Sequence, residues 1–471
     1  MPSRINFGGN IELSSESLYA PRTEAEVLEI LERHRGQSIR AVGRLHSWSQ
    51  VLNVHDVVID LRHFDRVILS DETNPTTAVL GAGLQIKNAL IKLKKHDLTL
   101  PSLGLITEQS IAGATATGTH GSGKQSLSHF IQEVTLAHYD PETGRPTLRV
   151  ISDGDELRAA RCSLGCLGIV LSVKMTVRPT YRVEFQLHEV RDIQSVFDSE
   201  ESYPLQQTYF LPWRWSYVLH QRRETSRPRT KLYWLHRCYW LLTFDLGLHF
   251  VLITAARILR APRLVQVLFK HILGKTVIQR WKVVDDSVPA LTMEHEWFRH
   301  IEIEMFVTRT KLPEAMKQLQ AVLELGAGVL KATENEFTSH SKVCWSKEEA
   351  DRFRGQYTHH YPICIRKVLP DDTLISMGSS DDEPWYAISL ISYEKPNRRQ
   401  GFFDFANLIC KVLMETCDAR PHWGKVCPIS AVQAAKAYPR LTEFNQIREL
   451  LDPHEVFSNE WLKQVIPWDQ S

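Results

Sequence analysis

Two loops rich in small residues carry side chains and main-chain amides that could bind a diphosphate. Residues 43–49 follow a short apolar run and contain His46. Residues 110–123 combine glycines, threonines and serines with His120. Successive exposed amides in such loops form anion-binding concavities, although each loop taken alone also fits an ordinary turn. Together the two loops predict a diphosphate site built from main-chain amides.

The spacing of the residues does not support other nucleotide or metal sites. Residues 118–124 are similar to a P-loop, but Gln125 replaces the Ser or Thr that binds magnesium there. Gly81 and Gly83 lack the third glycine of a dinucleotide fingerprint. The eight cysteines show neither CxxC nor zinc-finger spacing. We therefore expect no metal, and reduced, mostly buried thiols in a cytosol-facing protein.

The composition argues against one broad class of partner. The 471 residues carry a formal net charge of +1, whereas binding to nucleic acid normally rests on concentrated positive charge. The length also exceeds what a single hydrophobic core usually supports. We therefore expect two domains and no nucleic-acid partner.

The elements that must position the two loops alternate between strands and helices over residues 20–180. Thr23, followed by an acidic residue three positions later, predicts a capped helix. β-Branched runs at 38–42 and 56–61 predict strands on either side of the turn that contains His46. This pattern predicts an α+β domain.

A second domain is indicated after Pro179, where aromatic residues and arginines become more frequent. Residues 300–307 alternate between polar and apolar types. They predict a strand with Glu302 and Glu304 on one face. Residues 311–325 predict a helix with proline in its first turn.

The segment 221–282 departs from the even charge balance, with thirteen Lys and Arg against two acids. Residues 239–258 approach a membrane span in length and apolarity, but Asp245 and other internal charges each cost about 3 kcal/mol in mid-bilayer. The interleaved cations of residues 259–273 suit a helix lying among lipid headgroups. One interpretation is a membrane-surface element of a membrane-associated, cytosol-facing protein. The other is a buried pair of core helices in a cytoplasmic protein.

Six motifs follow one another along nearly the whole chain: GRLHS, LTLPSLGLITEQSIAGATATGTHGSG, SLGCLGIV, ICIRKV, RPHWGK and LDPHEVFSN. In this order they resemble the aldonolactone oxidases of the vanillyl-alcohol-oxidase flavoprotein superfamily, above all the gulonolactone oxidases. Alditol oxidases share most of these motifs. The resemblance implies an α+β fold with an FAD-binding domain of the p-cresol methylhydroxylase (PCMH) type at 1–180 and an α/β cap (substrate) domain at 181–416. The cap would contain a hydrophobic basic insertion at about 231–275, and residues 417–471 would return to the flavin site.

The resemblance also assigns a cofactor site. It implies FAD, with His46 joined covalently to the flavin 8α-methyl group, and a neutral histidine is a competent nucleophile near pH 7. Gly104 falls where a small residue leaves dioxygen a path to the flavin, although a glycine there also suits the loop backbone. The residues that would line FAD are Val42, Gly43, Arg44, Leu45, Ser47, Trp48, Ser110, Gly113, Thr117, Gly118, Thr119, His120, Gly121, Ile169, Val170 and Lys425.

Three residues would carry catalysis under this resemblance: Lys425, His422 and Arg366. Lys425 would place a cation near the pyrimidine end of the flavin, where charge develops as hydride arrives. Arg366 would stabilise an alkoxide-like hydroxyl through charge-assisted hydrogen bonds. The hydroxyl proton would leave to Lys425, to a nearby histidine or to water.

One position departs from the family pattern. Where relatives carry Glu-x-Arg, this chain has Cys364, which lies two residues before Arg366 and therefore on the same face of the strand. A thiol does not replace a carboxylate in binding sugar hydroxyls. Either Glu302 or Glu304 compensates from a neighbouring strand, or both are exposed strand residues.

The resemblance implies an FAD-linked oxidoreductase that transfers hydride from a substrate CH–OH to flavin N5 and reacts with dioxygen to give hydrogen peroxide. The expected substrate is a sugar lactone or another small polyol, and an aldonolactone would give an ascorbate-type product. Two alternatives remain open: an alditol or other carbohydrate oxidase, and a dehydrogenase with a different electron acceptor. Cys364 leaves open a third, a membrane-attached flavin-binding protein without turnover.

Overall fold

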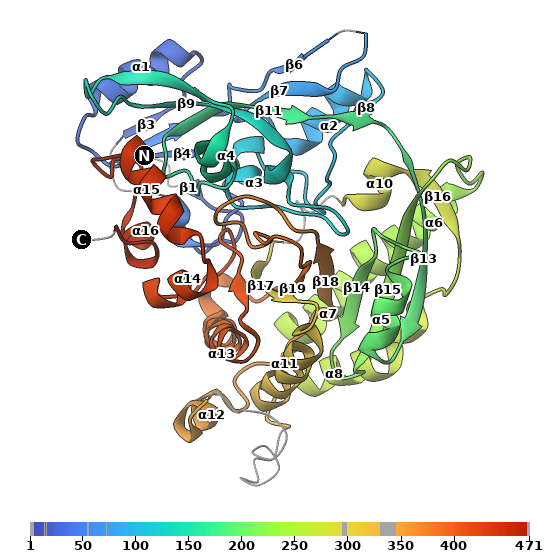
Figure 1. The fold of residues 1–471 in the computed structure, drawn as a ribbon. Coiled ribbons are helices and arrows are strands. Elements are labelled where there is room, and N and C mark those ends of the chain that lie inside the picture. Colours follow the sequence, from blue (N-terminus) through green and yellow to red (C-terminus); the bar gives the residue numbers. More distant parts are fainter. Residues whose placement is uncertain are drawn as a thin grey trace.

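The computed structural model describes residues 4–13, 15, 17–53, 56–71, 73–293, 299–329 and 345–468. The chain forms two parts, each with its own sheets, and its last residues return from the second part to the first (Figure 1). Both parts combine helices with mainly antiparallel sheets. The fold is therefore α+β, as the sequence predicts.

The first part contains a parallel sheet of three strands and an antiparallel sheet of five. The parallel sheet has the order β3 (Ser17–Tyr19), β5 (Val57–Asp60), β4 (Ile39–Val42). The antiparallel sheet has the order β10 (Pro146–Ile151), β9 (Ile131–Tyr139), β11 (Ile169–Thr176), β7 (Thr77–Gly81), β6 (Val67–Leu69). Strands β4 and β5 confirm the predicted strands on either side of the His46 turn.

Helix α1 (Glu24–Arg33) connects the parallel strands β3 and β4. The side chain of Thr23 accepts a hydrogen bond from the Glu26 amide at 3.2 Å, which confirms the predicted N-cap. Val27, Ile30 and Leu31 recur at helical spacing and are buried. Burial of this stripe fixes the helix and thereby the start of β4, which leads into the His46 turn.

The second part is built on one antiparallel sheet of eight strands. Its order is β16 (Val283–Asp286), β13 (Arg182–Val190), β15 (Ser216–Thr225), β14 (Gln207–Leu211), β18 (Ile363–Val368), β19 (Trp385–Ser392), β17 (Ile301–Thr308), β20 (Arg420–Pro421). Residues paired across neighbouring strands share a face of a sheet. We call one face of this sheet the inner face. It carries Leu187, His220, Arg222, Gln207, Tyr209, Leu211, Cys364, Arg366, Ser389, Glu302 and Glu304.

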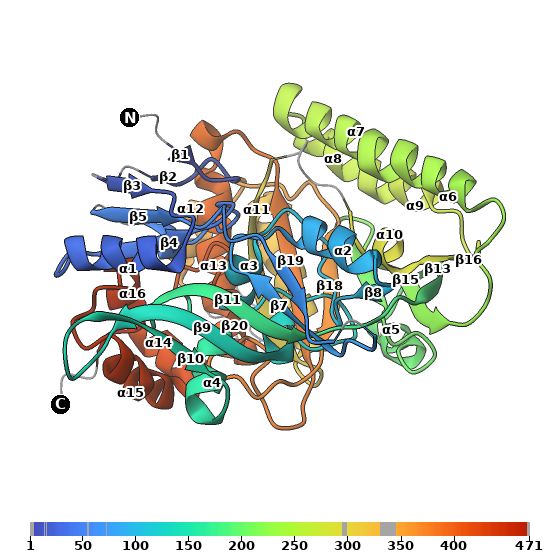
Figure 2. The same cartoon turned by 90° about the horizontal axis from the view of Figure 1, so that it is seen from above.

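A pair of helices projects along one edge of the second part (Figure 2). The first runs over Tyr233–Ile258 and comprises α6 (Tyr233–Trp240), η3 (Leu241–Leu248), α7 (His249–Ile253) and η4 (Thr254–Ile258). The second, which packs against the first, comprises α8 (Pro262–Val267), η5 (Leu268–Leu273) and α9 (Gly274–Thr276). By length and composition the first helix could cross a membrane, and 22% of its apolar window is buried. Most of the other residues of this helix are partly buried, and several large apolar side chains such as Leu242 and Phe250 are exposed.

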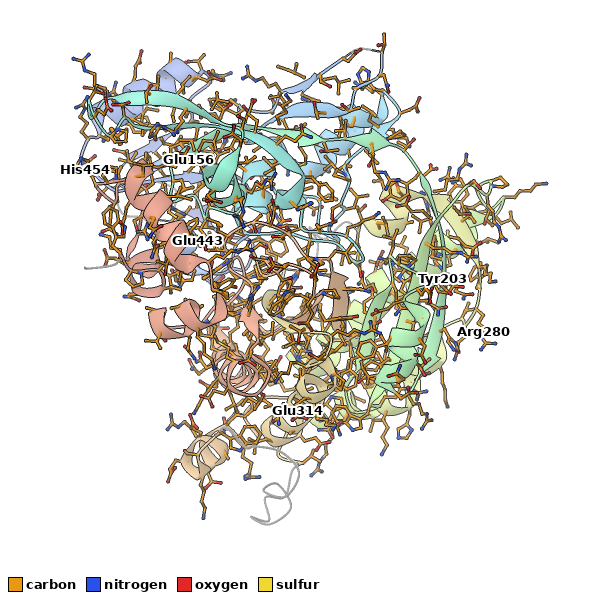
Figure 3. All side chains as sticks on the ribbon, viewed as in Figure 1. Glu156, Tyr203, Arg280, Glu314, Glu443 and His454 are labelled. Carbon is orange, nitrogen blue, oxygen red and sulfur yellow. The ribbon has the colours of Figure 1, made fainter. Side chains whose placement is uncertain are left out.

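The last residues connect the two parts. Strand β20 pairs with β17 at the edge of the eight-stranded sheet. Helix α15 (Leu441–Leu451) then packs against α4 (Gly154–Arg161) of the first part, and Figure 3 shows Glu443 of α15 close below Glu156 of α4. The Asn459 side-chain amide donates to the carbonyls of residues 50, 51 and 53, between β4 and β5. The C-terminal segment therefore contacts both parts.

The remaining elements are short connections and covering helices. In the first part they are β1 (Arg4–Ile5), β2 (Glu12–Leu13), η1 (Gln50–Leu52), α2 (Ile86–Lys94), β8 (Leu98–Thr99), α3 (Ile111–Ala116), η2 (Leu127–Phe130) and β12 (Arg178–Pro179). In the second part and the C-terminal segment they are α5 (Ile193–Ser199), α10 (Ser287–Leu291), α11 (Leu312–Gly326), α12 (Lys347–Phe353), η6 (Pro396–Arg398), α13 (Gln400–Cys417), α14 (Ala431–Ala437) and α16 (Glu460–Val465). Helix α11 confirms the helix predicted at 311–325. Six of the seven described cysteines are buried, and all seven are reduced.

Candidate active site

A cavity of about 790 Å³ lies in the first part, where the loop after β4 meets α3 and the turn before β11. Small residues and main chain make up much of its wall. The predicted cofactor residues that line it are Val42, Gly43, Arg44, Leu45, His46, Ser47, Ser110, Gly113, Thr117 and Val170. The structure therefore brings the two loops identified in the sequence to one cavity.

Two glycines lie close to Ser110, and one of them, Gly43, allows the two loops to approach each other. A Cβ atom at Gly43 would overlap the side chain of Ser110, and one at Gly113 would lie 3.0 Å from Ser110 Oγ. The small residues at these positions leave the main chain of the two loops uncovered, which suits an extended diphosphate. By its lining, the cavity suits the diphosphate portion of FAD.

His46 is held by backbone conformation and by an aromatic neighbour. Leu45 adopts a left-handed conformation with φ 56°, which is unfavourable for a leucine and is typically retained at functional sites. The ring of Phe7 stacks on the imidazole of His46 at 4.7 Å and 16° between planes. The Phe7 amide also donates to the Leu45 carbonyl at 2.8 Å. No motif in the sequence indicates Phe7, which lies far from the motif that contains His46.

The other predicted cofactor residues lie outside the wall of this cavity. Ile169 is buried in β11, and Gly118 adopts φ 72° next to Met377. The remaining predicted cofactor residues lie between the second small-residue loop and the second part of the protein. They are Trp48, Gly104, Thr119, His120, Gly121 and Lys425. A Cβ atom at Gly104 would lie 3.2 Å from Thr119 and 3.3 Å from the His120 carbonyl, so this glycine permits a close approach to the second loop.

Lys425 and Trp48 join the C-terminal segment to the first loop. The ammonium of Lys425 lies 4.3 Å from the centre of a Trp48 ring, a cation–π distance. The Trp48 amide donates to the Gly424 carbonyl at 2.8 Å, and its indole N–H donates to the His300 carbonyl at 2.8 Å. Lys425 also forms an ion pair with Glu302.

A buried charged cluster lies on the inner face where β17, β18 and β19 meet. Glu302 and Glu304 are 3% and 1% exposed, so the interpretation that they are exposed strand residues is wrong. The Ser389 hydroxyl lies within hydrogen-bond distance of both carboxylates, 2.8 Å from Glu304. Arg366 Nη1 is 3.5 Å from Glu304 Oε1. Side chains from the first part and from the C-terminal segment, His120, His422 and Lys425, lie against this face and cover the carboxylates.

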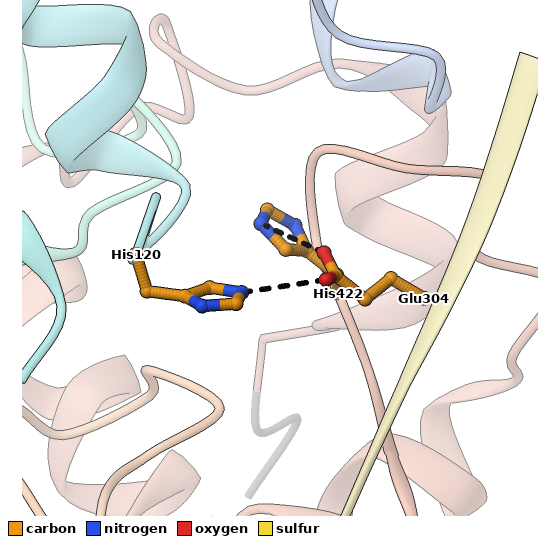
Figure 4. Close-up of side chains that lie close together, drawn as sticks. All are labelled: His120, Glu304 and His422. Carbon is orange, nitrogen blue, oxygen red and sulfur yellow. Dashed lines mark ion pairs between the residues drawn. The ribbon is translucent and has the colours of Figure 1, made fainter. Parts of the chain in front are cut away.

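Two histidines also lie close to the carboxylate of Glu304 (Figure 4). His120 Nε2 lies 3.5 Å from Oε1, and His422 Nε2 lies 3.9 Å from Oε2. Burial alone would raise the pKa of Glu304, but the charge and hydrogen bond of His120 in its protonated form, together with the charge of Lys425, hold it well below its usual value. Burial lowers the pKa of His422 to about 3, which the neighbouring Glu304 only partly opposes. The carboxylate is therefore ionised and His422 neutral near pH 7.

These three side chains could also hold a metal ion, since their donor atoms all lie within 4.8 Å of one another. The sequence predicted no metal site, and no spacing rule could have found a set drawn from residues 120, 304 and 422. Arg366 approaches the same carboxylate oxygen as His120. Its guanidinium already supplies positive charge to Glu304, which makes a metal cation less favourable there.

Cys364 and Arg366 lie side by side on β18, as predicted. Burial opposes the charge of Arg366, but Cys364, Glu304 and Glu302 together raise its pKa above the ordinary value. Burial also raises the pKa of the Cys364 thiol, which therefore stays protonated. The Gln207 side-chain amide donates to Cys364 Sγ at 3.0 Å. No short motif in the sequence indicates Gln207.

A second cavity, of about 870 Å³, begins at Cys364 and Arg366 and extends beneath the helical pair. We call it the apolar cavity. Its lining combines the inner face with the helical pair: Leu187, Tyr209, Leu211, Val218, Trp240, Phe244, Leu248, Leu273, Val277, Met293, Tyr361 and Ile391 are the larger side chains. Asp245 is the carboxylate of this wall among the described residues. The apolar run of the helical pair is visible in the sequence, but the cavity that one side of it covers is not.

Comparison with known proteins agrees with both parts of the structure. Residues 16–143 match the family described as FAD binding domain, and residues 173–465 match the family described as D-arabinono-1,4-lactone oxidase. A long-chain alcohol oxidase from an uncultured marine euryarchaeote is 46% identical over 99% of this chain and 97% of its own length. Mouse L-gulonolactone oxidase is 25% identical over 98% of this chain and 97% of its own.

A solved structure shares the fold. A solvent-stable cholesterol oxidase superposes with a TM-score of 0.73 at 15% sequence identity and covers 98% of this chain and 97% of its own. The family matches, the two-part fold and the charged cluster beside the loop cavity all agree with the resemblance seen in the motifs. The chain therefore belongs to the D-arabinono-1,4-lactone oxidase family and is an FAD-dependent oxidoreductase that acts on CH–OH groups.

Proposed function

We propose that the protein is an FAD-dependent alcohol oxidase whose substrate carries a hydrocarbon chain next to the oxidised carbon. The apolar cavity that begins at Cys364 and Arg366 is the observation that carries the proposal. A sugar lactone would leave hydroxyls without partners along these walls, which is unfavourable. A hydrocarbon chain gains about 0.8 kcal/mol for each methylene it removes from water. The name of the 46% identical relative, long-chain alcohol oxidase, supports the same substrate class.

FAD, when bound, would accept the hydride of the carbinol carbon and pass two electrons to dioxygen. Arg366 would orient the substrate hydroxyl and stabilise it as it loses its proton. Lys425, held between Glu302 and Trp48, would supply a fixed positive charge at the flavin. Val42, Gly43, Ser47, Ser110 and Gly113 would hold the diphosphate, and His46 would form the covalent link.

The hydroxyl proton has an acceptor in His120. Its Nδ1–H donates to the Gly121 carbonyl at 2.9 Å, because a carbonyl can only accept. With Nδ1–H directed to that carbonyl, Nε2 is the ring nitrogen that would take up the proton, and Glu304, 3.5 Å away, would stabilise the imidazolium. His422 is less suited, since its Nδ1 accepts the Gly424 amide and its neutral form keeps the proton on Nε2.

Flavin reduction under anaerobic conditions tests the proposal. The purified holoenzyme is mixed with straight-chain primary alcohols of increasing length, with L-gulono-1,4-lactone and with xylitol, and the flavin absorbance is followed. We expect the second-order rate constant for reduction to rise with chain length and to exceed that for the lactone. Faster reduction by the lactone or by xylitol would overturn the apolar substrate.

A sugar lactone or polyol is the second candidate. It is favoured by the charged cluster, in which Glu302, Glu304, Ser389 and Arg366 offer several partners for hydroxyl groups. The gulonolactone oxidase relatives support it too. Oxygen uptake in the same substrate series separates an oxidase from a dehydrogenase, because a dehydrogenase would reduce its flavin without consuming oxygen. If no substrate in the series reduces the flavin, the result would favour a flavin-binding protein without turnover.

The same proposal places the helical pair on a membrane surface. Large apolar side chains point outward along it, Leu242 at 66% and Phe250 at 73% exposure among them. The surrounding segment 221–282 has an excess of Lys and Arg, which attracts anionic headgroups. The apolar cavity lies directly beneath, so a hydrophobic alcohol would reach it from the lipid.

Sedimentation with anionic vesicles tests the membrane contact. The double variant Leu242→Glu, Phe250→Glu should stay in the supernatant while the unmodified protein sediments. Val432→Glu is the matched control, because Val432 is 81% exposed on α14 outside the helical pair. A protein that never sediments with such vesicles would contradict the contact without affecting the proposed reaction.

A further inference from the structure

The substrate hydroxyl would lie where two cavities meet. Besides the apolar cavity, a much smaller cavity lies against Arg366. Arg366, Gln207 and Leu105 line both. The small cavity is polar and cationic, with Lys124, Arg222 and Arg366 in its wall. The inner face therefore offers an apolar space and a cationic space next to the reacting position.

Arg222 is the unusual member of the small cavity. It is 4% exposed, and its guanidinium makes two side-chain hydrogen bonds, both to neutral groups: Nη1 donates to Gln207 Oε1 at 3.2 Å and Nη2 donates to His220 Nδ1 at 2.8 Å. Its Nε has no hydrogen-bond partner. Within the described ranges no carboxylate lies within 4.0 Å of it, and burial, with a smaller contribution from the positive charge of Arg366, lowers its pKa.

Burying a guanidinium that has no carboxylate partner and few hydrogen-bond acceptors costs folding free energy. Arg40 shows how the chain satisfies a comparable residue. Arg40 is 3% exposed and also lacks a carboxylate, but its terminal nitrogens donate to four main-chain carbonyls, those of Val51, Leu164, Gly165 and Phe457. Arg222 has no such set of acceptors and faces a cavity instead. An anion bound in that cavity would supply the hydrogen-bond acceptors and the negative charge that Arg222 lacks.

We propose that Arg222 and Arg366 form a carboxylate subsite, so that the preferred substrate is a 2-hydroxycarboxylate with a hydrocarbon tail. This inference rests on the proposed function. The side-chain amide of Gln207 bridges Arg222 and Cys364, at 3.2 and 3.0 Å from its two ends. The distance between the bound anion and the carbinol would therefore be little more than the length of one amide group. A carboxylate on the carbon next to the carbinol meets this spacing, and the tail extends into the apolar cavity.

The opposite wall reinforces this orientation. Asp245 lies in the apolar cavity and would repel a carboxylate placed there. The reaction would convert R–CH(OH)–COO⁻ and O2 to R–CO–COO⁻ and H2O2. The C–H bond supplies two electrons through FAD, the hydroxyl proton goes first to His120, and both protons finally reach the peroxide.

Three ten-carbon compounds test the subsite in the holoenzyme. 2-Hydroxydecanoate carries the carboxylate next to the carbinol, 10-hydroxydecanoate carries it at the far end, and 1-decanol lacks it. We expect 2-hydroxydecanoate to reduce the flavin at least about tenfold more efficiently than either of the others, as one charge-assisted pair would give. In Arg222→Met this preference should fall by at least about tenfold, and Arg222→Lys should restore part of it.

Binding of decanoate, which cannot be oxidised, gives a readout independent of turnover. Calorimetry should show a dissociation constant at least about tenfold higher for Arg222→Met than for the unmodified protein. Without ligand, Arg222→Met should melt no lower than the unmodified protein, because it removes an uncompensated buried charge. Arg182→Met, a surface cation on β13 of the same sheet, should change neither preference nor binding.

Two results would overturn the subsite: equal reduction by 2-hydroxydecanoate and 1-decanol, or equal decanoate binding by Arg222→Met and the unmodified protein. In both cases reduction by 1-decanol would leave the proposed function standing. Failure of the proposed function is distinct, since the flavin would then respond to the lactone or to no member of the series.

Discussion

The ring of Phe7 stacks on the imidazole of His46 at 4.7 Å, nearly parallel to it. Phe7 is further fixed edge-on by His300 at 5.4 Å, a residue that precedes the strand carrying Glu302 and Glu304. The orientation of the proposed flavin-linking histidine therefore depends on a residue near the N-terminus and on the second part of the protein. Neither neighbour belongs to the motif in which His46 occurs.

His46→Asn should abolish covalent attachment of flavin. After acid precipitation the pellet of the unmodified protein should stay yellow, and that of the variant should be colourless. Phe7→Ala should give a partly coloured pellet, because loss of a stacking contact of about 0.5–1.5 kcal/mol leaves the imidazole less well oriented. Phe130→Ala, which removes an aromatic residue of η2 outside this cluster, is the control. A yellow pellet from His46→Asn would refute the link.

Lys425→Met should slow flavin reduction by at least about 100-fold, because it removes a fixed charge near the developing one. The variant also leaves Glu302 without its cation, so the melting temperature should fall. Lys436→Met, at a 68% exposed side chain on α14, should change neither quantity. Stopped-flow absorbance and thermal melting measure the two effects. An unchanged rate constant for reduction would contradict the role of Lys425.

Filling the apolar cavity should change the preferred chain length. Leu211→Trp and Val218→Phe each add volume to its wall, so the most efficient alcohol should become shorter by several carbons. Flavin reduction across the alcohol series measures the shift, with Val432→Phe on the exposed surface of α14 as the control. If both cavity variants keep the original preference, the hydrocarbon chain does not occupy this cavity.

Asp245 should make stability depend on pH. Burial raises the pKa of its carboxyl to about 6, against a hydrogen bond from Trp240 that acts in the opposite direction. The folded state thus holds this proton more tightly than the unfolded state, so the contribution of Asp245 is present below about pH 4 and is lost as the pH rises through about 6. Asp245→Asn should melt higher than the unmodified protein above about pH 7, and this difference should shrink below about pH 4. Melting curves across this range measure it, and a constant difference would refute the shift.

Local patterns in the sequence predicted much of the first part. The strands around His46, the cap at Thr23 and the small-residue loops rest on short-range rules of propensity and backbone geometry. The alternation of residues 300–307 also placed Glu302 and Glu304 on one face correctly. It could not show whether that face is exposed, because the burial depends on His120, His422 and Lys425, which come from distant segments of the chain.

The residues that the sequence did not reveal act through contacts between distant strands. Gln207 and Arg222 belong to no recognisable motif, and only the register of β14 and β15 brings them next to Arg366. The same holds for the cluster of His120, Glu304 and His422, drawn from three separate segments. Whether an arginine has a carboxylate partner is a property of the folded chain, and no spacing rule reports it.

The position of β20 has a consequence for dynamics. Since β20 pairs with β17 while α15 packs against α4, a hinge opening between the two parts would have to break one of these contacts. Entry of substrate and release of product are then left to local breathing of the helices above the apolar cavity. If the helical pair lies on a membrane, as proposed, turnover should respond to the fluidity of the lipid more strongly than to the viscosity of the bulk solvent.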